Sequence, residues 1–201
     1  MTTNGLWSPA RRAFLRSALA FPAVVLAGRR ATAQQGTLPP TPSCIDKGTP
    51  TLSQTAGPFF KPRSPQRVSL LDPDMRGTRI VVTGTVLSTR CRPVSGALLD
   101  FWQADDQGRY DNAGFRLRGH QFADDQGRYR LETIVPGLYT GRTRHIHVRV
   151  QAPNGPVLTT QLYFPDEPGN RSDFIFRPEL VMAVRDETGV KTGVFNFVLD
   201  V

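Results

Sequence analysis

Short runs of β-forming residues, separated by turn signals, constrain this chain more than any other feature. The runs at residues 79–88 (RIVVTGTVLS) and 98–103 (LLDFWQ) are rich in branched and aromatic residues. Similar runs follow at residues 128–135, 145–151, 157–164, 180–185 and 194–201. No helical periodicity of useful length occurs after residue 33. The pattern predicts an all-β fold, a single-domain β-sandwich with short strands and long loops.

The first 33 residues differ in composition from the rest of the chain. They contain five arginines and no acidic residue, and the pair Arg11-Arg12 precedes an apolar stretch that leads to an A-T-A motif at residues 31–33. This layout is typical of an export signal, and the twin arginine indicates the twin-arginine route. The apolar stretch is shorter than the ~20 residues that span a bilayer, so we expect no stable membrane anchor. We therefore predict a periplasmic or secreted protein.

The charge of the chain changes when this segment is set aside. The whole chain carries a formal net charge of +8, whereas residues 34–201 hold 20 basic and 17 acidic residues. This near balance gives no basic surface for nucleic acid, so we predict no nucleic-acid partner. Residues 34–56 are rich in Pro, Thr, Ser and Gly and predict an extended lead-in, followed by the β-sandwich domain at residues 57–201.

The chain has two cysteines, Cys44 and Cys91. In an exported protein an even pair favours a disulfide over a reactive thiol or a metal site. A Cys44–Cys91 disulfide would tie the N-terminal segment to the sheet and stabilise the fold by about 4 kcal/mol in the chain-entropy model.

One heptapeptide occurs twice: A-D-D-Q-G-R-Y stands at residues 104–110 and again at 123–129. Both copies predict a tight Asp/Gly turn that leads into a strand. A single recurrence does not make a repeat array. It does raise the question of whether both terminal tyrosines, Tyr110 and Tyr129, serve the same purpose.

The segment H-I-H-V-R-V at residues 145–150 is the best local signal for chemistry. Side chains alternate along a strand, so His145, His147 and Arg149 share one face while the three apolar residues turn to the core. Two imidazoles on one face are well placed to hold a metal ion. An isolated H-x-H is more often a pair of surface histidines, so both interpretations stay open on this segment alone.

Further ligands for such a metal would have to be oxygen donors. No acidic residue follows in residues 148–153, and His120 is interpreted as an ordinary loop residue. Tyr110 and Tyr139 are candidates, although a buried tyrosine often serves packing alone. A phenol has a pKa near ~10 and binds well only when the metal displaces its proton. Ferric iron does this better than zinc or ferrous iron.

Four motifs in consistent order together carry a resemblance. They are D-F-W-Q-A-D…G-R-Y at residues 100–110, P-G-L-Y at 136–139, R-T-R-H-I-H at 142–147 and T-Q-L-Y-F at 160–164. The chain resembles the intradiol ring-cleavage dioxygenases of the catechol, protocatechuate and hydroxyquinol type, whose early G-P-aromatic loop is matched at residues 57–60. The short segment between Tyr139 and His145, together with the cysteine pair, is most similar to exported single-domain members.

The resemblance implies a β-sandwich enzyme with one non-haem Fe(III) per chain. It implies four ligands, namely Tyr110, Tyr139, His145 and His147. It further implies that Arg142 and Gln161 are active-site residues and that Tyr139 also serves as a base. The implied reaction inserts both atoms of O2 into a catechol-type aromatic and opens the ring between the two hydroxylated carbons to a muconate-type diacid.

Two other interpretations stay open. A transthyretin-like β-sandwich that binds a partner without catalysis would have similar turns and strands, but it would not need the four ligand residues to converge. An intradiol fold that acts on an unusual phenolic is the third. The sequence leaves open which catechol is cleaved and whether the chain forms a homo-oligomer. Residues 169–201 carry no motif that we can interpret, and we expect them to complete the sandwich.

Overall fold

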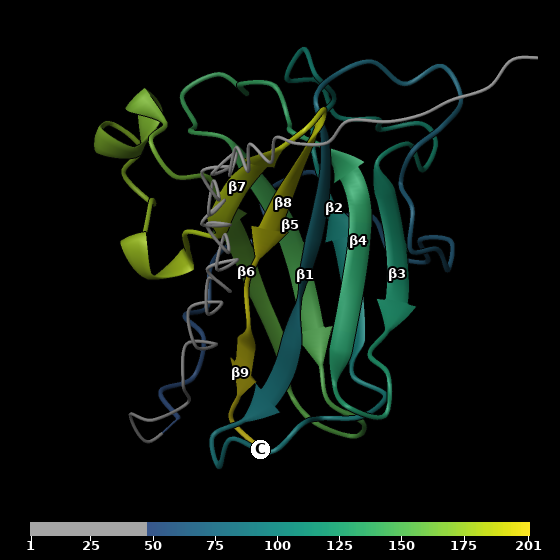
Figure 1. Cartoon of the computed structure of the whole chain (residues 1–201), viewed down its shortest axis with the longest axis vertical. Helices are drawn as coiled ribbons and strands as arrows, with labels where there is room; N and C mark the ends of the chain where they lie inside the picture. The colour runs from purple at the N-terminus through teal and green to yellow at the C-terminus, as the bar shows by residue number, and fades with distance from the viewer. Residues whose placement is uncertain (1–47) are drawn as a thin grey trace, which may run out of the picture. The chain divides into compact units, whose positions relative to one another are not determined.

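The computed structural model describes residues 48–201, which form two β-sheets (Figure 1). One sheet contains β1 (Arg79–Ser88), β4 (Arg128–Ile134), β7 (Ala183–Glu187), β8 (Val190–Val194) and β9 (Phe197–Leu199). The other contains β2 (Leu98–Trp102), β3 (Arg118–Phe122), β5 (His145–Gln151) and β6 (Val157–Tyr163). Two short 3₁₀ helices, η1 (Pro168–Arg171) and η2 (Pro178–Leu180), are the only helices in this part of the chain. The predicted all-β sandwich is confirmed.

The two sheets differ in how their strands pair. The strand order of the second sheet is β3-β2-β5-β6, and every pair in it is antiparallel. In the first sheet β1 pairs antiparallel with β4 but parallel with both β8 and β9. The first strand, β1, is therefore paired with β8 and β9, which come from the last part of the chain.

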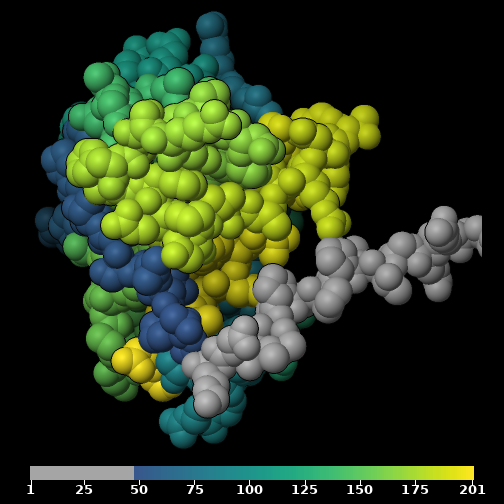
Figure 2. Space-filling model, turned by 90° about the vertical axis from the view of Figure 1, so that its left-hand side faces the viewer, coloured from purple at the N-terminus to yellow at the C-terminus, as the bar shows by residue number. Residues whose placement is uncertain are grey.

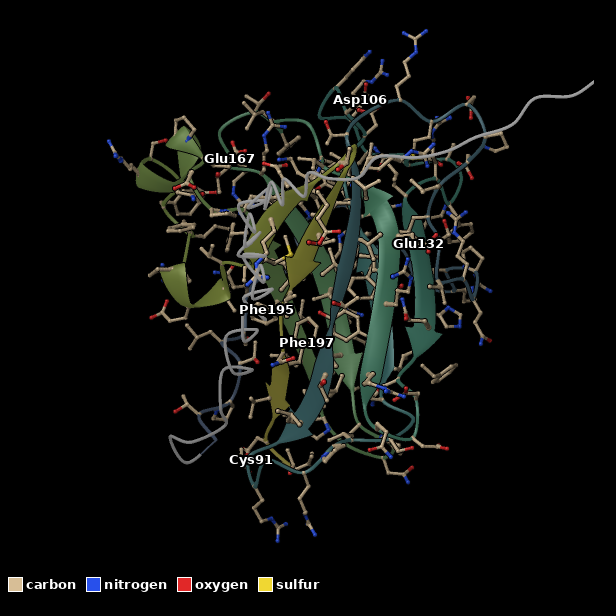
Figure 3. The ribbon with its side chains drawn as sticks, viewed as in Figure 1. Cys91, Asp106, Glu132, Glu167, Phe195 and Phe197 are labelled. Carbon is tan, nitrogen blue, oxygen red and sulfur yellow. The ribbon has the colours of Figure 1, made fainter. Side chains whose placement is uncertain are left out.

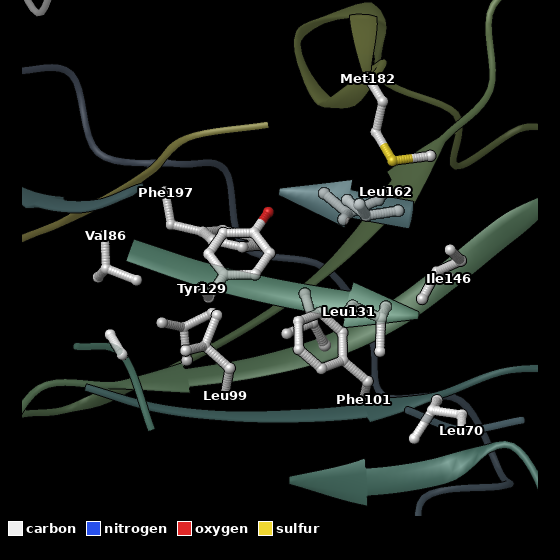
Figure 4. Close-up of a cluster of buried hydrophobic side chains, with 14 of the residues drawn as sticks. Leu70, Val86, Leu99, Phe101, Tyr129, Leu131, Ile146, Leu162, Met182 and Phe197 are labelled. Carbon is white, nitrogen blue, oxygen red and sulfur yellow. The ribbon is translucent and has the colours of Figure 1, made fainter. Parts of the chain in front are cut away.

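Apolar side chains from both sheets meet between them and form the core (Figure 4). In β5, the residues Ile146, Val148 and Val150 are fully buried, as the alternation predicts. Leu131 of β4 and Phe197 of β9 approach from the other sheet and are fully buried as well. Burying each such side chain contributes about 1.5–3 kcal/mol, which makes this layer the main source of stability.

The opposite face of the second sheet, which we call the outer face, carries polar and aromatic side chains. Strand register places Trp102, His147 and Gln161 in one row across β2, β5 and β6, and His145 beside Tyr163 in the next. These five side chains belong to no part of the apolar core, yet each is buried. Loops therefore cover the outer face and enclose the groups on it.

One covering segment, residues 54–64, crosses the outer face. The backbone carbonyl of Thr55 accepts a hydrogen bond from Gln161, and the hydroxyl of Ser64 donates one to Asp100. Residues 165–180 pack beside it, because the Gln54 side chain donates to the carbonyl of Ile175 over 2.6 Å. Figure 2 shows this yellow-green surface adjoining the blue residues that follow residue 48.

Most predicted strands have the predicted positions, and the differences have physical causes. The strands at 79–88 and 145–151 have the expected bounds, and those at 98–103, 128–135 and 157–164 end one residue earlier. The run at 180–185 begins later because Pro178 starts η2, and the run at 194–201 is divided between β8 and β9. His120, expected in a loop, lies in β3 opposite Asp100.

Residues 1–47 lie outside the described part of the chain, and with them the predicted export signal and Cys44. The proposed disulfide and the predicted segment boundaries therefore stay predictions. Within residues 48–201 no helix is long and apolar enough to cross a membrane. Cys91 is exposed in the turn after β1, at the opposite end of the sheets from Asp106 and Glu167 (Figure 3).

Candidate metal centre

The two histidines of β5 direct the same ring nitrogen toward each other. His145 Nδ1 lies 2.6 Å from the carbonyl oxygen of Thr143 and donates its proton there. This bond leaves Nε2 of His145 with a free lone pair, the arrangement typical of a histidine that binds a metal. Nε2 of His145 lies 3.2 Å from Nε2 of His147. Two potential nitrogen ligands therefore lie side by side on the outer face.

Stacking, rather than a hydrogen bond, orients the ring of His147. The indole of Trp102 lies parallel to it, with ring centroids 4.8 Å apart and planes within 5°. On another side Gly57 comes so close that a Cβ there would lie 3.6 Å from Cε1 of His147. His147 Nδ1 is buried without a hydrogen-bond partner among the described residues. The strand and these two neighbours fix the ring.

Both imidazoles are neutral near pH 7. Burial lowers the pKa of His145 to about 4, with the Arg142 charge acting in the same direction and the Thr143 carbonyl opposing it. Burial, followed by the neighbouring His145, brings the pKa of His147 well below its ordinary value. A metal requires unprotonated nitrogen, so the folded protein already presents both groups in the ligand form.

Tyr110 supplies an oxygen beside these nitrogens. The turn at residues 104–110 carries it to the outer face, where its hydroxyl lies 3.3 Å from Nε2 of His145. Phe59 stacks on its ring at 4.3 Å between centroids and 13° between planes. Burial raises the pKa of Tyr110 above its ordinary value, while the charges of Arg142 and Arg118 act in the opposite direction. A strongly charged ion would be needed to ionise this phenol at neutral pH.

Tyr139 belongs to the loop between β4 and β5 and is half-buried. Its ring meets the ring of Tyr110 edge-on at 5.8 Å and the ring of Phe59 edge-on at 5.4 Å. The loop is tied to the first heptapeptide turn, because the N–H of Gly137 donates to the carbonyl of Asp105 over 2.7 Å. The structure therefore brings the two tyrosines and the two histidines into one cluster.

Three donor atoms of this cluster, Tyr110 Oη, His145 Nε2 and His147 Nε2, have separations that fit one metal ion. Ligands that each lie about 2.0–2.1 Å from one ion lie roughly 3.0–3.4 Å from each other, and the observed separations are 3.2 and 3.3 Å. Within residues 48–201 no three His, Cys, Asp or Glu side chains come together. The donor atoms present here are two imidazole nitrogens and a phenol oxygen, and a phenolate oxygen suits a strongly charged metal ion.

Arg142 and Gln161 stand together next to this cluster. The Nη2 of Arg142 donates to Oε1 of Gln161 over 2.7 Å, and Nε2 of Gln161 donates to the carbonyl of Thr55 over 3.0 Å. The hydroxyl of Tyr163 lies 2.6 Å from Oε1 of Gln54 and 3.1 Å from Oε1 of Gln161, and burial raises the pKa of Tyr163 to about 12. Tyr163 thus belongs to the hydrogen-bond network around Arg142.

Sequence reasoning missed several residues of the site. Arg118 is 1% exposed and donates to the carbonyls of Phe59, whose ring stacks on Tyr110, and of Asp111, the residue after Tyr110. Trp102 was visible only as part of a motif, and a lone arginine such as Arg118, the first residue of β3, carries no signal of its own. His120 does not join the cluster, because its Nδ1 bonds the carbonyl of Ser64.

The chain is similar to known dioxygenases in sequence and in structure. A family model described as dioxygenase matches residues 55–201. The hydroxyquinol 1,2-dioxygenase of Rhizobium sp. (strain MTP-10005) is 32% identical over 151 residues, which are 62% of this chain and 51% of that protein. The protocatechuate 3,4-dioxygenase beta chain of Burkholderia cepacia is 38% identical over 119 residues, 50% of this chain and 51% of that protein. The chain thus spans about half the length of these relatives.

Among solved structures, this chain is similar to the dioxygenase domain of a dioxygenase carbohydrate-binding protein fusion from Streptomyces sp. SirexAA-E. The two share 56% identity and a TM-score of 0.75, over 76% of this chain and 99% of that one. The hydroxyquinol 1,2-dioxygenase from Pseudomonas putida DLL-E4 gives 29% identity and a TM-score of 0.66, over 75% of this chain and 66% of that one.

Proposed function

The chain belongs to the intradiol ring-cleavage dioxygenase family, and from this premise we propose that it opens a catechol-type aromatic between its two hydroxylated carbons. The reaction incorporates both atoms of O2 and yields a muconate-type diacid. The observation that carries the proposal is the proximity of three donor atoms. Nε2 of His145 lies 3.3 Å from Oη of Tyr110 and 3.2 Å from Nε2 of His147. A binding module would not need such a donor set.

One ferric ion per chain is the proposed cofactor, held by Tyr110, Tyr139, His145 and His147. When bound, Fe(III) makes a chelated catechol electron-poor and reactive toward O2. The low pKa values of the two histidines keep their nitrogens available, and the stacked Phe59 and Trp102 hold the rings in place. The protein therefore supplies an ordered donor set before the metal arrives.

The residues have separate tasks in the proposed reaction. A catechol must lose two protons to chelate through both oxygens. Tyr139, on a loop and half-buried, is better placed than Tyr110 to move and accept one of those protons. Arg142 stabilises negative charge that develops on the substrate, and Gln161 holds the guanidinium by its Oε1.

The first experiment is a visible absorption spectrum of the full chain, with a metal analysis, before and after catechol is added without oxygen. We expect a tyrosinate-to-iron charge-transfer band that shifts with catechol, followed by oxygen uptake across a panel of catechols. A protein that stays colourless after loading with ferric iron would contradict the proposal and favour the non-catalytic binding module.

Tyr139→Phe tests the proposed base. Because the phenylalanine ring keeps the packing against Phe59 but cannot accept a proton, we expect turnover to fall by about 10²–10⁴-fold. The measurement is the rate at which the spectrum changes when catechol is mixed with the iron-loaded protein. Deprotonation at the wild-type rate would remove the role assigned to Tyr139.

We further propose that the protein is exported by the twin-arginine route and works outside the cytoplasm, with a Cys44–Cys91 disulfide. The support is the Arg11-Arg12 pair, the apolar stretch and the A-T-A motif. Replacing both arginines by lysine should retain the protein in the cytoplasm, as cell fractionation would measure. Export at the wild-type level would argue against this route.

A further inference from the structure

We propose that Asp173 is a positioning residue of the active site, which fixes the guanidinium of Arg142 so that one of its nitrogens faces the substrate. The inference deepens the proposed function and rests on it. It also assigns a role to residues 169–175, a segment whose sequence carries no recognisable motif.

Three donors at the site bind the carboxylate of Asp173. Its Oδ2 accepts from Nε of Arg142 over 2.8 Å and from the backbone N–H of Thr143 over 3.0 Å. Its Oδ1 accepts from the N–H of Ile175 over 3.1 Å. The Asp173 side chain is 1% exposed and that of Arg142 is 14% exposed. A charge-assisted bond so well shielded from water holds its partner firmly.

The segment that carries Asp173 is itself anchored to the chain next to Arg142. The N–H of Asp173 donates to the carbonyl of Gly169, and the Thr143 hydroxyl donates to Oδ1 of Asn170 over 2.7 Å. The side-chain amide of Asn170 donates in turn to the carbonyl of Phe164 over 2.9 Å. These bonds fix the distance between the 169–175 segment and the start of β5, so the carboxylate has one position.

Two of the three guanidinium nitrogens of Arg142 are thereby fixed by the protein. Asp173 holds Nε, and Oε1 of Gln161 holds Nη2 over 2.7 Å. Nη1 has no acceptor among residues 48–201, and it is not enclosed. Arg142 also lies close enough for its charge to act on Tyr110, His145 and His147. Nη1 is therefore the nitrogen left to meet negative charge on a bound substrate.

Asp173→Asn in the full, iron-loaded chain tests this role. Asparagine keeps the volume, but it has one acceptor oxygen for the three donors and no charge. We expect kcat for catechol cleavage to fall about 10- to 100-fold, as a small misplacement of a catalytic group does. The visible spectrum should not change, because the proposed metal ligands are the same. The dissociation constant of catechol, measured without oxygen, should stay within about 2-fold of the wild-type value.

Asp124→Asn is the matched control. Asp124 also accepts two backbone N–H bonds and an arginine Nε, at 2.9, 2.8 and 2.7 Å, but in a surface turn. Its kcat should equal that of the wild type. Loss of activity in this control comparable to that in Asp173→Asn would overturn the inference, because any such turn would then have the same effect.

A double-variant cycle separates positioning from a general structural role. If Asp173 acts through Arg142, adding Asp173→Asn to Arg142→Gln should change kcat by less than about 2-fold. Losses that multiply would overturn the inference. Arg142→Lys keeps the charge but lacks the fork that Asp173 and Gln161 hold. We expect kcat of Arg142→Lys to fall about 10- to 100-fold, and this variant serves as the test if Asp173→Asn does not fold. A wild-type kcat in Arg142→Lys would overturn the inference.

The proposed function and the inference fail in different ways. A wild-type protein that binds iron but consumes no oxygen with any catechol would overturn the function and the inference with it. An active wild type with an equally active Asp173→Asn variant would overturn the inference alone.

Discussion

Tyr110 and Tyr129 end two copies of the same heptapeptide, and the two copies fold into the same turn. In each copy the first aspartate, Asp105 or Asp124, accepts hydrogen bonds at 2.8–2.9 Å from the backbone N–H groups two and four residues later. Its second oxygen accepts from the arginine side chain of the same turn. The local backbone is therefore a property of the seven residues and does not depend on their place in the fold.

The tyrosines nevertheless have different surroundings. Tyr129 is 4% exposed in the core, and its hydroxyl donates to the carbonyl of Phe195 over 2.8 Å. Tyr110 lies on the outer face, with its hydroxyl 3.3 Å from Nε2 of His145. Burial raises the pKa of both, but for Tyr129 burial is the sole cause, while cations act on Tyr110 in the opposite direction.

The residues that follow each turn account for the difference. After Tyr129 the sequence alternates as R-L-E-T-I, and the chain continues into β4 beside β1. After Tyr110 comes Asp111, whose carboxylate accepts from the N–H groups of Ala113, Gly114 and Arg116 and bends the chain away from the sheet. The same turn thus serves packing or chemistry according to the next few residues.

The largest expected effect that would separate the two copies comes from Tyr110→Phe. The variant loses the proposed oxygen ligand, and changing even a group that only supports a metal ligand costs about 10–100-fold. We therefore expect turnover to fall by more than about 100-fold and the charge-transfer band to weaken. Oxygen uptake and the visible spectrum are the measurements. A Tyr110→Phe variant with full colour and activity would show that Tyr110 is not a metal ligand. Tyr129→Phe is the control.

The next effect compares the two turn glycines. Gly108 and Gly127 have φ of 80° and 70°, and a Cβ would lie 2.1 Å from the carbonyl oxygen of Leu138 or 2.6 Å from that of Val86. We expect each change to alanine to lower the free energy of unfolding by about 2 kcal/mol. Only Gly108→Ala should also alter the catechol-bound spectrum, because Leu138 precedes Tyr139. Urea unfolding and anaerobic titration measure these effects, and equal spectra for both variants would refute the difference.

Tyr129→Phe should have a smaller effect, on stability alone. The carbonyl of Phe195 loses its buried donor, so we expect the free energy of unfolding to fall by about 1 kcal/mol. Turnover at a temperature where the protein is folded should match the wild type. Urea unfolding monitored by tryptophan fluorescence measures the change, and an activity loss without unfolding would place Tyr129 in the site.

The smallest effect is expected for the arginines of the turns. Arg109 and Arg128 are about 70% exposed, and such ion pairs contribute little because water and salt screen them. We expect Arg109→Ala and Arg128→Ala to leave the urea midpoint and turnover unchanged within error. A clear difference between the two variants would show that the turns are less alike than their hydrogen bonds indicate.

The sequence predicts those parts of the fold in which periodicity is strong. β1 and β5 alternate clearly and were predicted at their bounds. β3 was missed, because R-G-H-Q-F has one large apolar residue, Phe122, and that side chain is 52% exposed. What makes β3 a strand is its pairing with β2 and the segment that covers it, and neither is visible in the local sequence.

The candidate site divides in a similar way. The resemblance indicates Tyr110, Tyr139, His145 and His147, and in the fold these four side chains lie in one cluster. Asp173 could not be predicted in this way. Its role depends on its ion pair with Arg142, and only the fold brings these two residues together. Charged residues that act through a distant partner leave no local pattern.

The parallel pairing of β1 with β8 and β9 also bears on the order of events during synthesis. The N–H of Thr85 in β1 donates to the side chain of Asn196 across 111 residues, so β1 leaves the ribosome long before β8 and β9 exist. Until then its edge is open to other chains, and such long-range pairing closes slowly. Chaperones that shield this strand during the delay should therefore raise the yield of folded protein.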